Sequence, residues 1–408
     1  MAAETDAMRV CFFNRSYWPD TGATGQLLTE LAEDLVARHG FEVTVVTGHP
    51  PSHREPLPRR TTKNGVLIIR AAGTTFSPRR FAGRAANYLT YFVSALWTAL
   101  FLPRQDVTVA LTDPPIIGLA ALAARPRHGM VFYCQDIFPE VAGLLEDFHS
   151  STVNAILDRL NRFLVARASR IVVLGDTMAG RLVAGKGADP SRVTVIHNWA
   201  DTAAITPAEK DNAFARAHGL VDRFVVLHAG NIGLAQNLDV VVDAADLLRT
   251  RPDILVLFIG DGNRRAALEQ SVKARALDNV QFLPFQPRDQ LRWTYGSADL
   301  CLVSLKPGLA GYIVPSKLYP ILAAGRPYVA AVEDSSEVAS ITRQHGCGVV
   351  VAPDSASALA SQILALADDP DRRRGMQSRA REASALFARD SQVAAHAKVL
   401  RDLGSSPC

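Results

Sequence analysis

A pattern suited to phosphate binding lies near residue 317. Pro315, Ser316 and Lys317 open an apolar segment that ends at Gly325, so the sequence predicts a short helix with Ser316 and Lys317 at its start. Free amides, the positive helix dipole and an ammonium form a site for phosphate. The apolar stretch 298–303 predicts a buried strand just upstream, and open α/β sheets bind ligands where strands end. A helix cap beside a solvated lysine explains these residues equally well.

Two carboxylates follow another predicted strand. Asp136 and Glu140 come after the apolar stretch 130–134, where either could orient or deprotonate an acceptor hydroxyl, or bind a sugar hydroxyl. An ordinary interpretation stays open, with Asp136 as a helix cap and Glu140 solvated. The loop 17–26 also follows a strand and precedes a helix pattern, and its glycines would let backbone amides approach a ligand closely.

The length and composition are those of a globular chain. It has 408 residues, 48% of them apolar and 21% charged, so two or three domains are expected. A net charge of +4 is too mild for a nucleic-acid partner, although it suits an anionic ligand or a membrane surface. Five scattered cysteines without a CxxC pattern predict a reducing compartment. The short acidic stretch 2–8 does not match a signal peptide, so we expect a cytoplasmic location.

The alternation of strands, loops and helices predicts two doubly wound, Rossmann-like α/β domains that face each other across a cleft. We expect the first domain at 1–200, a polar linker at 201–217 and the second domain at 218–389. An amphipathic helix at 390–403 could return to the first domain. A cleft between two sets of strand ends is the natural place for an active site.

Several familiar motifs are missing or incomplete. The segment after Gly260 begins like a dinucleotide fingerprint, but Arg265 stands where the third glycine belongs, so a nicotinamide enzyme is disfavoured. The sequence has no Ser-centred elbow, no Walker phosphate loop and no DxD motif flanked by an apolar strand. We therefore expect chemistry without a metal ion or a cofactor.

An apolar segment at 87–102 allows two interpretations. It is shorter than a bilayer span, it follows three arginines at 79–84, and Thr90, Ser94 and Thr98 place a mildly polar strip along it. One interpretation is an interfacial helix, so that 79–102 contacts a membrane carrying a lipid-linked acceptor. The other is a core helix packed on the sheet, and we favour the core helix.

The motifs in their order resemble a known family. The second half carries AGNIGLAQNL, FIGDG, VQFLPF and VPSKLYPILAAGRP, and the first half carries NRSYWPDTGATGQL, QDIFPE and VIHNWAD. Together they resemble a GT-B glycosyltransferase, and more narrowly the retaining enzymes of family 4 in the branch that builds capsule and O-antigen sugars. The resemblance implies that a sugar moves from a nucleotide sugar, UDP- or GDP-linked, to an acceptor with retention, and that the second domain holds most of the nucleotide.

The chain departs from the family pattern in three places. The usual Arg and Lys after the first strand of the second domain are Asn231 and Gln236 here, so the resemblance leaves Lys317 as the main cation for the diphosphate. The usual pair of glutamates, with seven residues between them, falls near Tyr312 and at Pro320. The usual histidine of the first domain is a glutamine, which leaves the aspartate after it as the polar anchor.

The resemblance implies the following site. Catalysis is assigned to Lys317, Asp136 and Glu140, with Lys317 and nearby amides stabilising the leaving diphosphate. Donor contacts are expected from Gly230, Asn231, Gly233, Gln236, Gly260, Asp261, Gly262, Leu283, Phe285, Ser316 and Lys317. Acceptor contacts are expected from Gly22, Thr24, Gly25, Asp136 and Asn198.

Other functions remain open from the sequence. The acceptor is either a polyprenyl-linked saccharide or a small natural product. A nucleotide-sugar 2-epimerase shares the plan and the donor site but needs no acceptor. A protein that binds nucleotide sugars without turnover would explain the altered glutamate positions.

Overall fold

A computed structural model describes residues 7–20, 22–50, 57–76, 81–145 and 150–405. The chain divides into two compact units. Unit 1 comprises Met1–His197 and Asp390–Cys408, and unit 2 comprises Asn198–Arg389. Two features used in the sequence analysis lie outside the described residues. They are the acidic residues near the start of the chain, Glu4 and Asp6, and the arginines Arg79 and Arg80.

Unit 1 is built on an eight-stranded sheet with the order β3-β4-β2-β1-β5-β6-β7-β8. Neighbouring strands pair in parallel except for β3 with β4, which pair antiparallel. The strand order reverses between β1 and β5, where a doubly wound sheet opens a crevice for ligands. The strands are β1 Arg9–Phe13, β2 Glu42–Thr47, β3 Arg60–Lys63, β4 Val66–Arg70, β5 Val107–Ala110, β6 Gly129–Cys134, β7 Arg170–Val173 and β8 Val193–Val195.

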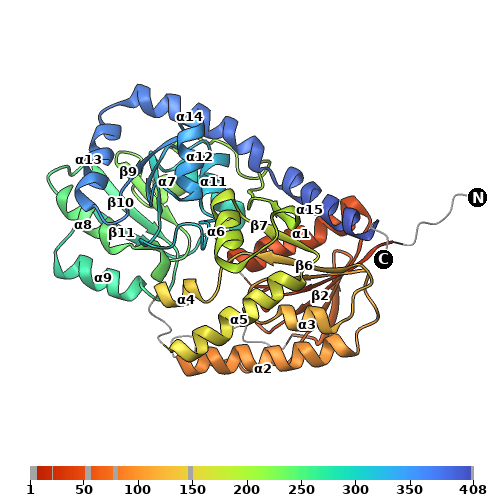
Figure 1. Cartoon of the computed structure of the whole chain (residues 1–408). Coiled ribbons are helices and arrows are strands. Elements are labelled where there is room, and N and C mark those ends of the chain that lie inside the picture. The colour runs from red at the N-terminus through yellow and green to blue at the C-terminus, as the bar shows by residue number, and fades with distance from the viewer. Residues whose placement is uncertain (1–6, 21, 51–56, 77–80, 146–149, 406–408) are drawn as a thin grey trace, which may run out of the picture. The chain divides into compact units, whose positions relative to one another are not determined.

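Helices cover both faces of this sheet, as parallel strands require. Figure 1 shows α1 and α15 together on one side and α2 and α3 on the other. The helix α1 ends at Gly40, whose φ of 71° suits a glycine. The helices of unit 1 are α1 Ala23–His39, α2 Phe81–Leu100, α3 Gly118–Ala123, α4 Glu140–Leu144, α5 Ser151–Arg167, α6 Asp176–Lys186 and, from Asp390 on, α15 Arg389–Gly404.

Unit 2 contains a six-stranded, fully parallel sheet with the order β11-β10-β9-β12-β13-β14. This is the order of a doubly wound nucleotide-binding fold, and its reversal point lies between β9 and β12. The predicted pair of doubly wound α/β units is therefore confirmed. The strands are β9 Phe224–Ala229, β10 Ile254–Ile259, β11 Val280–Leu283, β12 Leu300–Ser304, β13 Tyr328–Ala331 and β14 Gly348–Val351.

The core of unit 2 explains why its strands read as continuous apolar runs. Every residue of β10 is buried, and alternate residues such as Val256 and Phe258 pack with Val242 of α8 and Leu359 of α13. The stretch 201–217, expected as a linker, lies within unit 2. The helices are α7 Ala213–Ala217, α8 Asp239–Leu247, α9 Arg265–Ala274, α10 Leu291–Gly296, α11 Leu318–Ala323, α12 Glu337–His345, α13 Ala356–Ala367 and α14 Pro370–Ser384.

Short 3-10 turns complete the chain: η1 Pro190–Arg192, η2 Leu234–Gln236, η3 Arg288–Gln290 and η4 Ala385–Phe387. Among the helices of the described residues, none is both long enough and apolar enough to cross a bilayer.

The last helix, α15, belongs to unit 1 although it follows unit 2 in the chain. Its Asp390 pairs with Arg38 of α1, and Arg401 donates to the carbonyl oxygen of His39 at 2.9 Å. His396 is buried against the ring of Tyr133 in β6, with ring centroids 4.8 Å apart. Burial lowers the pKa of His396 to about 3, so this imidazole is neutral in the folded protein.

The buried His396 predicts a loss of stability in acid. An unfolded histidine gains a proton below its ordinary pKa, whereas folded His396 does not, so the free energy of unfolding falls as the pH drops from about 6.5 toward 3. Between pH of about 7.5 and about 5, this group accounts for about 2 kcal/mol of that fall. Thermal unfolding at both pH values should show a smaller loss for His396→Leu than for wild type. Equal losses would contradict this assignment.

Candidate functional site

The loops at the carboxyl ends of β9, β10 and β12 form the candidate site of unit 2. The loop after β9 hydrogen-bonds to the loop after β10, since the Ile232 N–H donates to the Asp261 carbonyl at 2.9 Å. It also meets the loop after β12, since the Lys306 N–H donates to the Ala235 carbonyl at 2.7 Å. The site therefore lies at the reversal point of the sheet.

Glycines are required where the β9 and β10 loops meet. Gly260 has a φ of +143°, and a Cβ there would lie 1.9 Å from the carbonyl oxygen of Gly230. Gly262 has a φ of +156°, and a Cβ there would lie 2.3 Å from the carbonyl oxygen of Ile232. Three of the predicted donor-site glycines are thus brought together, and side chains are excluded from their contact.

The loop after β9 satisfies some of its own polar groups. The Gly233 N–H donates to Oε1 of Gln236 at 3.1 Å, so the amide expected to meet a phosphate is engaged within the loop. Asn231 is exposed, and a Cβ on Gly233 would lie 2.6 Å from its Nδ2. The Gly262 N–H donates to Oδ1 of Asp261 at 2.8 Å. Gln236 therefore shapes this loop, and Asn231 presents an amide beside it.

Lys317 lies where the loop after β12 turns into α11. The helix begins at Leu318 and is six residues long, and Ser316 makes no side-chain cap, so the helix start is a weaker anion site than the sequence suggested. The Lys317 Nζ lies 3.0 Å from Nε2 of His228, a fully buried residue of β9. An ammonium only donates, so His228 accepts and is neutral. Burial and the Lys317 charge hold the pKa of His228 well below its ordinary range.

The partner of Lys317 sets it apart from other lysines of the chain. Three other lysines pair with carboxylates. Lys63 pairs with Glu33, Lys210 with Asp299, and Lys186 with both Glu140 and Asp158. In the part of the chain that the structure describes, the Lys317 ammonium is recorded only against the His228 ring. Burial lowers the pKa of Lys317 to about 7. A bound anion would relieve this cost of holding the charge.

The carboxyl end of β11 borders the same site. The Leu283 carbonyl accepts from the Gly260 N–H at 3.1 Å and from Nη1 of Arg265 at 3.1 Å, so its oxygen, expected to face a base, already has two donors. Phe285 is 55% exposed and offers a ring face for stacking. Arg265 therefore hydrogen-bonds to the carboxyl ends of both β10 and β11. It stands at the position where a dinucleotide fingerprint has its third glycine.

Sequence analysis missed two residues of this site. His228 lies inside an apolar strand, where a histidine gives no pattern of its own. Only its position, two residues before the Gly230 turn, indicates that it is near the site. Glu333 follows β13, and its Oε2 accepts from the N–H groups of Gly308 at 3.0 Å and Ala310 at 3.2 Å. This carboxylate therefore holds the loop that leads to Lys317.

In unit 1, Asp136 lies near a carboxylate that the sequence did not single out. Arg15 Nε lies 3.2 Å from Asp113 Oδ1, and the Ser16 hydroxyl donates to Asp113 Oδ2 at 2.9 Å. These residues follow β1 and β5, on either side of the reversal point. Burial, with the charge of Asp113 as a second cause, raises the pKa of Asp136 to about 7. Asp136 can therefore exchange a proton near neutral pH.

Glu140 is engaged elsewhere. Its Oε1 lies 2.7 Å from Nζ of the buried Lys186, which also lies 2.6 Å from Oδ1 of Asp158. This ion cluster joins α4, α5 and α6 and gives Glu140 a structural partner. The carboxylate whose charge acts on Asp136 is Asp113, whereas Glu140 pairs with Lys186.

The start of α1 supplies the other acceptor residues predicted for unit 1. The Gly22 N–H donates to Oδ1 of Asp20 at 3.0 Å. A Cβ on Gly25 would lie 3.2 Å from the Asp20 side chain, so a glycine fits this contact. Thr24 is half-buried in the same turn. Asn198, grouped with these residues by the sequence, belongs to unit 2, where its buried Oδ1 has no hydrogen-bond partner among the described residues.

A metal centre finds no support in the described ranges. No group of three or more His, Cys, Asp or Glu residues there could hold a metal ion.

Comparisons with known proteins agree with this architecture. A family model described as a glycosyl transferase 4-like domain matches residues 22–199, and one described as glycosyl transferases group 1 matches residues 210–383. The structure of HepE from Anabaena, in complex with UDP and glucose, superposes with a TM-score of 0.74. It is 18% identical and covers 97% of this chain and 100% of its own, so this likeness shows the fold alone. The chain belongs to the glycosyltransferases of the GT-B fold.

Two curated relatives are similar to this chain in sequence. The probable glycosyltransferase WbjE of Pseudomonas aeruginosa is 30% identical over 270 residues, which is 64% of this chain and 66% of WbjE. The putative colanic acid biosynthesis glycosyl transferase WcaI of Escherichia coli is 26% identical over 375 residues, which is 87% of this chain and 91% of WcaI.

The two carboxylates of unit 1 predict opposite mutant behaviour. Asp136→Asn should keep the melting temperature and lower turnover about a hundredfold, because it removes a titrating group at the strand ends. Glu140→Gln should lower the melting temperature, because Lys186 loses a charged partner, and leave turnover within a few-fold. Thermal unfolding and a sugar-transfer assay on both purified variants check this. The reverse pattern would return Glu140 to the catalytic site.

Proposed function

We propose that the protein transfers a sugar from a uridine diphosphate sugar to an acceptor with retention of configuration and without a metal ion. Unit 2 holds the donor and unit 1 holds the acceptor. The observation that carries the proposal is the Lys317 ammonium, which lies beside neutral His228 and among glycine-lined loops at the sheet reversal. The uridine nucleotide is supported by the similar fold of HepE, whose structure contains UDP.

Stabilisation of the leaving group accounts for most of the proposed catalysis. As the bond from the sugar C1 to the diphosphate breaks, its electron pair stays on the phosphate oxygen, where Lys317 meets the growing charge. A preorganised donor at developing charge is typically the largest single catalytic contribution. The acceptor oxygen then bonds to C1 on the face that the diphosphate leaves. The departing phosphate takes the acceptor proton there, while Asp136 orients the hydroxyl.

The other donor contacts follow from the loops. Phe285 offers its exposed ring to the uracil, and Asn231 and Asp261 present polar groups beside the glycines. Lys317 and the backbone around Ser316 face the diphosphate. The glutamate that usually binds the ribose in the family is Pro320 here, so another residue must bind it. We assign this role to Asp261.

A polyprenyl-linked saccharide is the acceptor that we favour. The name of WcaI connects it with colanic acid biosynthesis, a polysaccharide pathway, and the family branch that the motifs resemble builds capsule and O-antigen sugars. A small natural product is the alternative acceptor. A cytoplasmic site is part of the proposal, and the buried free thiols of Cys11, Cys134, Cys301 and Cys347 agree with a reducing compartment.

Removing the ammonium should stop most of the reaction. Lys317→Ala is expected to lower turnover about a hundredfold with the fold intact, because the leaving diphosphate loses its cation. The matched control is Lys273→Ala, which removes an exposed lysine of α9 in the same unit and should change turnover less than about twofold. A transfer assay with UDP-sugars measures both. Unchanged turnover in Lys317→Ala would exclude Lys317 from the site.

Donor affinity should also depend on pH through the same group. Because the pKa of Lys317 is lowered to about 7, the ammonium is progressively lost above that pH, and the affinity for UDP should fall as the pH rises. Calorimetric titration at pH of about 6.5 and about 8.5 should show this fall in wild type and a flatter response in Lys317→Ala. Protonation of UDP itself is common to both proteins, so equal pH responses would contradict the assignment.

A further inference from the structure

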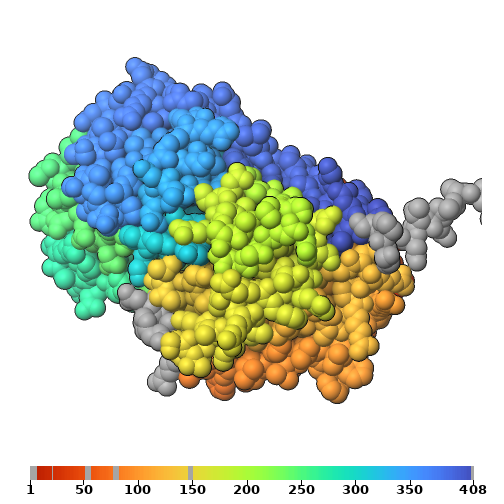
Figure 2. Space-filling view, viewed as in Figure 1, coloured from red at the N-terminus to blue at the C-terminus, as the bar shows by residue number. Residues whose placement is uncertain are grey.

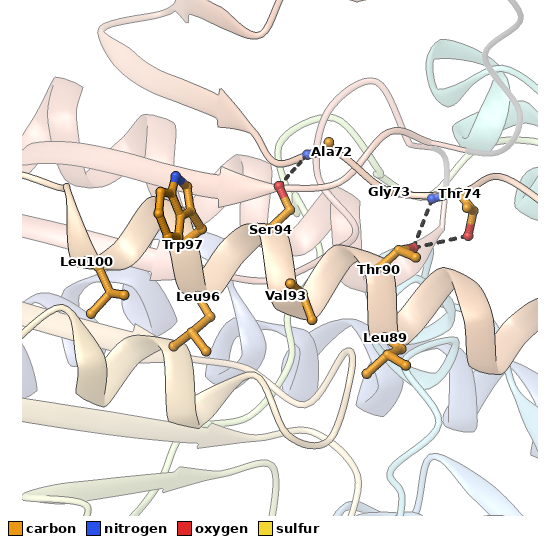
Figure 3. Close-up of a pocket in the computed structure, with 10 residues that line it drawn as sticks. All are labelled: Ala72, Gly73, Thr74, Leu89, Thr90, Val93, Ser94, Leu96, Trp97 and Leu100. Atoms are coloured by element: carbon orange, nitrogen blue, oxygen red, sulfur yellow. Dashed lines mark hydrogen bonds between the residues drawn. The ribbon is translucent and has the colours of Figure 1, made fainter.

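Two hydroxyls of the helix α2 hydrogen-bond to the backbone of the segment 72–74, which follows β4. The Ser94 hydroxyl accepts from the Ala72 N–H at 2.8 Å, and the Thr90 hydroxyl accepts from the Thr74 N–H at 3.0 Å. Asn87 accepts from the Phe76 N–H at 2.9 Å and donates to the Phe76 carbonyl at 2.9 Å. Figure 3 shows Thr90 and Ser94 pointing at the segment 72–74. The polar strip of α2 thus binds a segment of the chain that is itself largely exposed.

The large apolar side chains of α2 are left outside. Tyr91, Ala95 and Ala99 are buried, which matches half of the core-helix interpretation. The other half is wrong, because four large residues of the helix and one just after it are exposed. They recur at helical spacing and form one stripe, the α2 stripe: Leu89, Val93, Trp97, Leu100 and Phe101.

The α2 stripe is a continuous surface. Figure 2 shows α2 at the molecular surface, in orange along the lower edge of the view. Part of the stripe, with Leu96 and the backbone of 72–74, lines a shallow groove of about 840 Å³. Trp97 is 65% exposed and Phe101 is 70% exposed, with ring centroids 4.8 Å apart. Exposed apolar patches of this kind mark interaction sites.

The charge around the stripe points to an anionic occupant. The described residues from 81 to 105 include two arginines, Arg84 and Arg104, and no aspartate or glutamate. Arg104 is exposed three residues after Phe101. Tryptophan and phenylalanine favour the boundary between lipid headgroups and acyl chains, and basic residues add attraction to anionic headgroups. Exposed aromatic side chains at the end of α2, with an exposed arginine just after them, therefore fit a bilayer surface.

A second copy of this chain fits the stripe less well. A two-fold interface places the same surface on both partners, so it would double the positive charge that Arg84 and Arg104 place beside the stripe. The described segment 81–105 has no carboxylate to compensate this repulsion.

We propose that the α2 stripe docks unit 1 on an anionic lipid bilayer, with Trp97 and Phe101 inserted at the headgroup boundary. The docking is a property of unit 1 and does not depend on the identity of the sugar donor. It would bring the enzyme to the surface where a lipid-linked acceptor resides.

Co-sedimentation with lipid vesicles tests the proposal. The full-length protein should partition onto vesicles containing phosphatidylglycerol, and more weakly onto pure phosphatidylcholine vesicles or at high salt. The double variant Trp97→Ser, Leu100→Ser should weaken partitioning about tenfold or more, because two side chains no longer enter the bilayer. The matched control Leu247→Ser changes a side chain of α8 in unit 2 that is 56% exposed, and it should partition like wild type.

A second readout locates the inserted residue. Brominated acyl chains should quench the tryptophan fluorescence of wild type, and Trp97→Phe should lose most of this quenching while it still partitions. Melting temperature and UDP binding should stay unchanged in all variants, which separates a failure of docking from a failure of the donor site.

Three results would overturn the proposal. The first is no partitioning of wild type onto anionic vesicles. The second is equal partitioning of wild type and the double variant. The third is a dimer in lipid-free solution that the double variant abolishes, which would assign the stripe to a second copy of the chain.

Discussion

The charge on Lys317 is the constraint on which the site of unit 2 depends. Its ammonium lies at the carboxyl ends of the strands against the neutral ring of His228, and no carboxylate is recorded beside it among the described residues. Holding a partly buried cation in this way is unfavourable until an anion arrives. Elsewhere in the chain Lys186 is held by two carboxylates and stabilises structure. The same residue type therefore serves stability in unit 1, whereas in unit 2 we propose that it binds a ligand.

The surrounding fold makes this arrangement available. The sheet reverses between β9 and β12, which opens a crevice at the carboxyl ends of the strands. Gly260 and Gly262 let the loops after β9 and β10 touch through their backbones. Glu333 holds the loop after β12 through two amides, and α11 then begins next to Lys317. Loop geometry thus places one positive charge at the site where we propose that a diphosphate binds.

Sequence patterns predicted the two doubly wound units, because buried parallel strands read as apolar runs and the loops between them carry glycine. They also singled out Lys317, Gly230 and Gly260, which the structure places close together. They missed His228 and Asp113, whose roles depend on neighbours distant in sequence. They could not foresee that Lys186 engages Glu140, that the hydroxyls of α2 bind the segment 72–74, or that several large apolar residues of α2 are exposed. Side-chain direction depends on which segments pack together, and periodicity alone does not report it.

Thermal-shift titration with UDP, GDP, dTDP and ADP, on wild type and Lys317→Met, tests the central claim most directly. A ligand that binds only the folded state adds about 2.7 kcal/mol of stability at a hundred times its dissociation constant. The account predicts that UDP raises the melting temperature of wild type, that the other three nucleotides raise it less, and that the UDP effect shrinks in the variant. An absence of stabilisation by all four nucleotides, or an equal UDP shift in the variant, would contradict a diphosphate site built around Lys317.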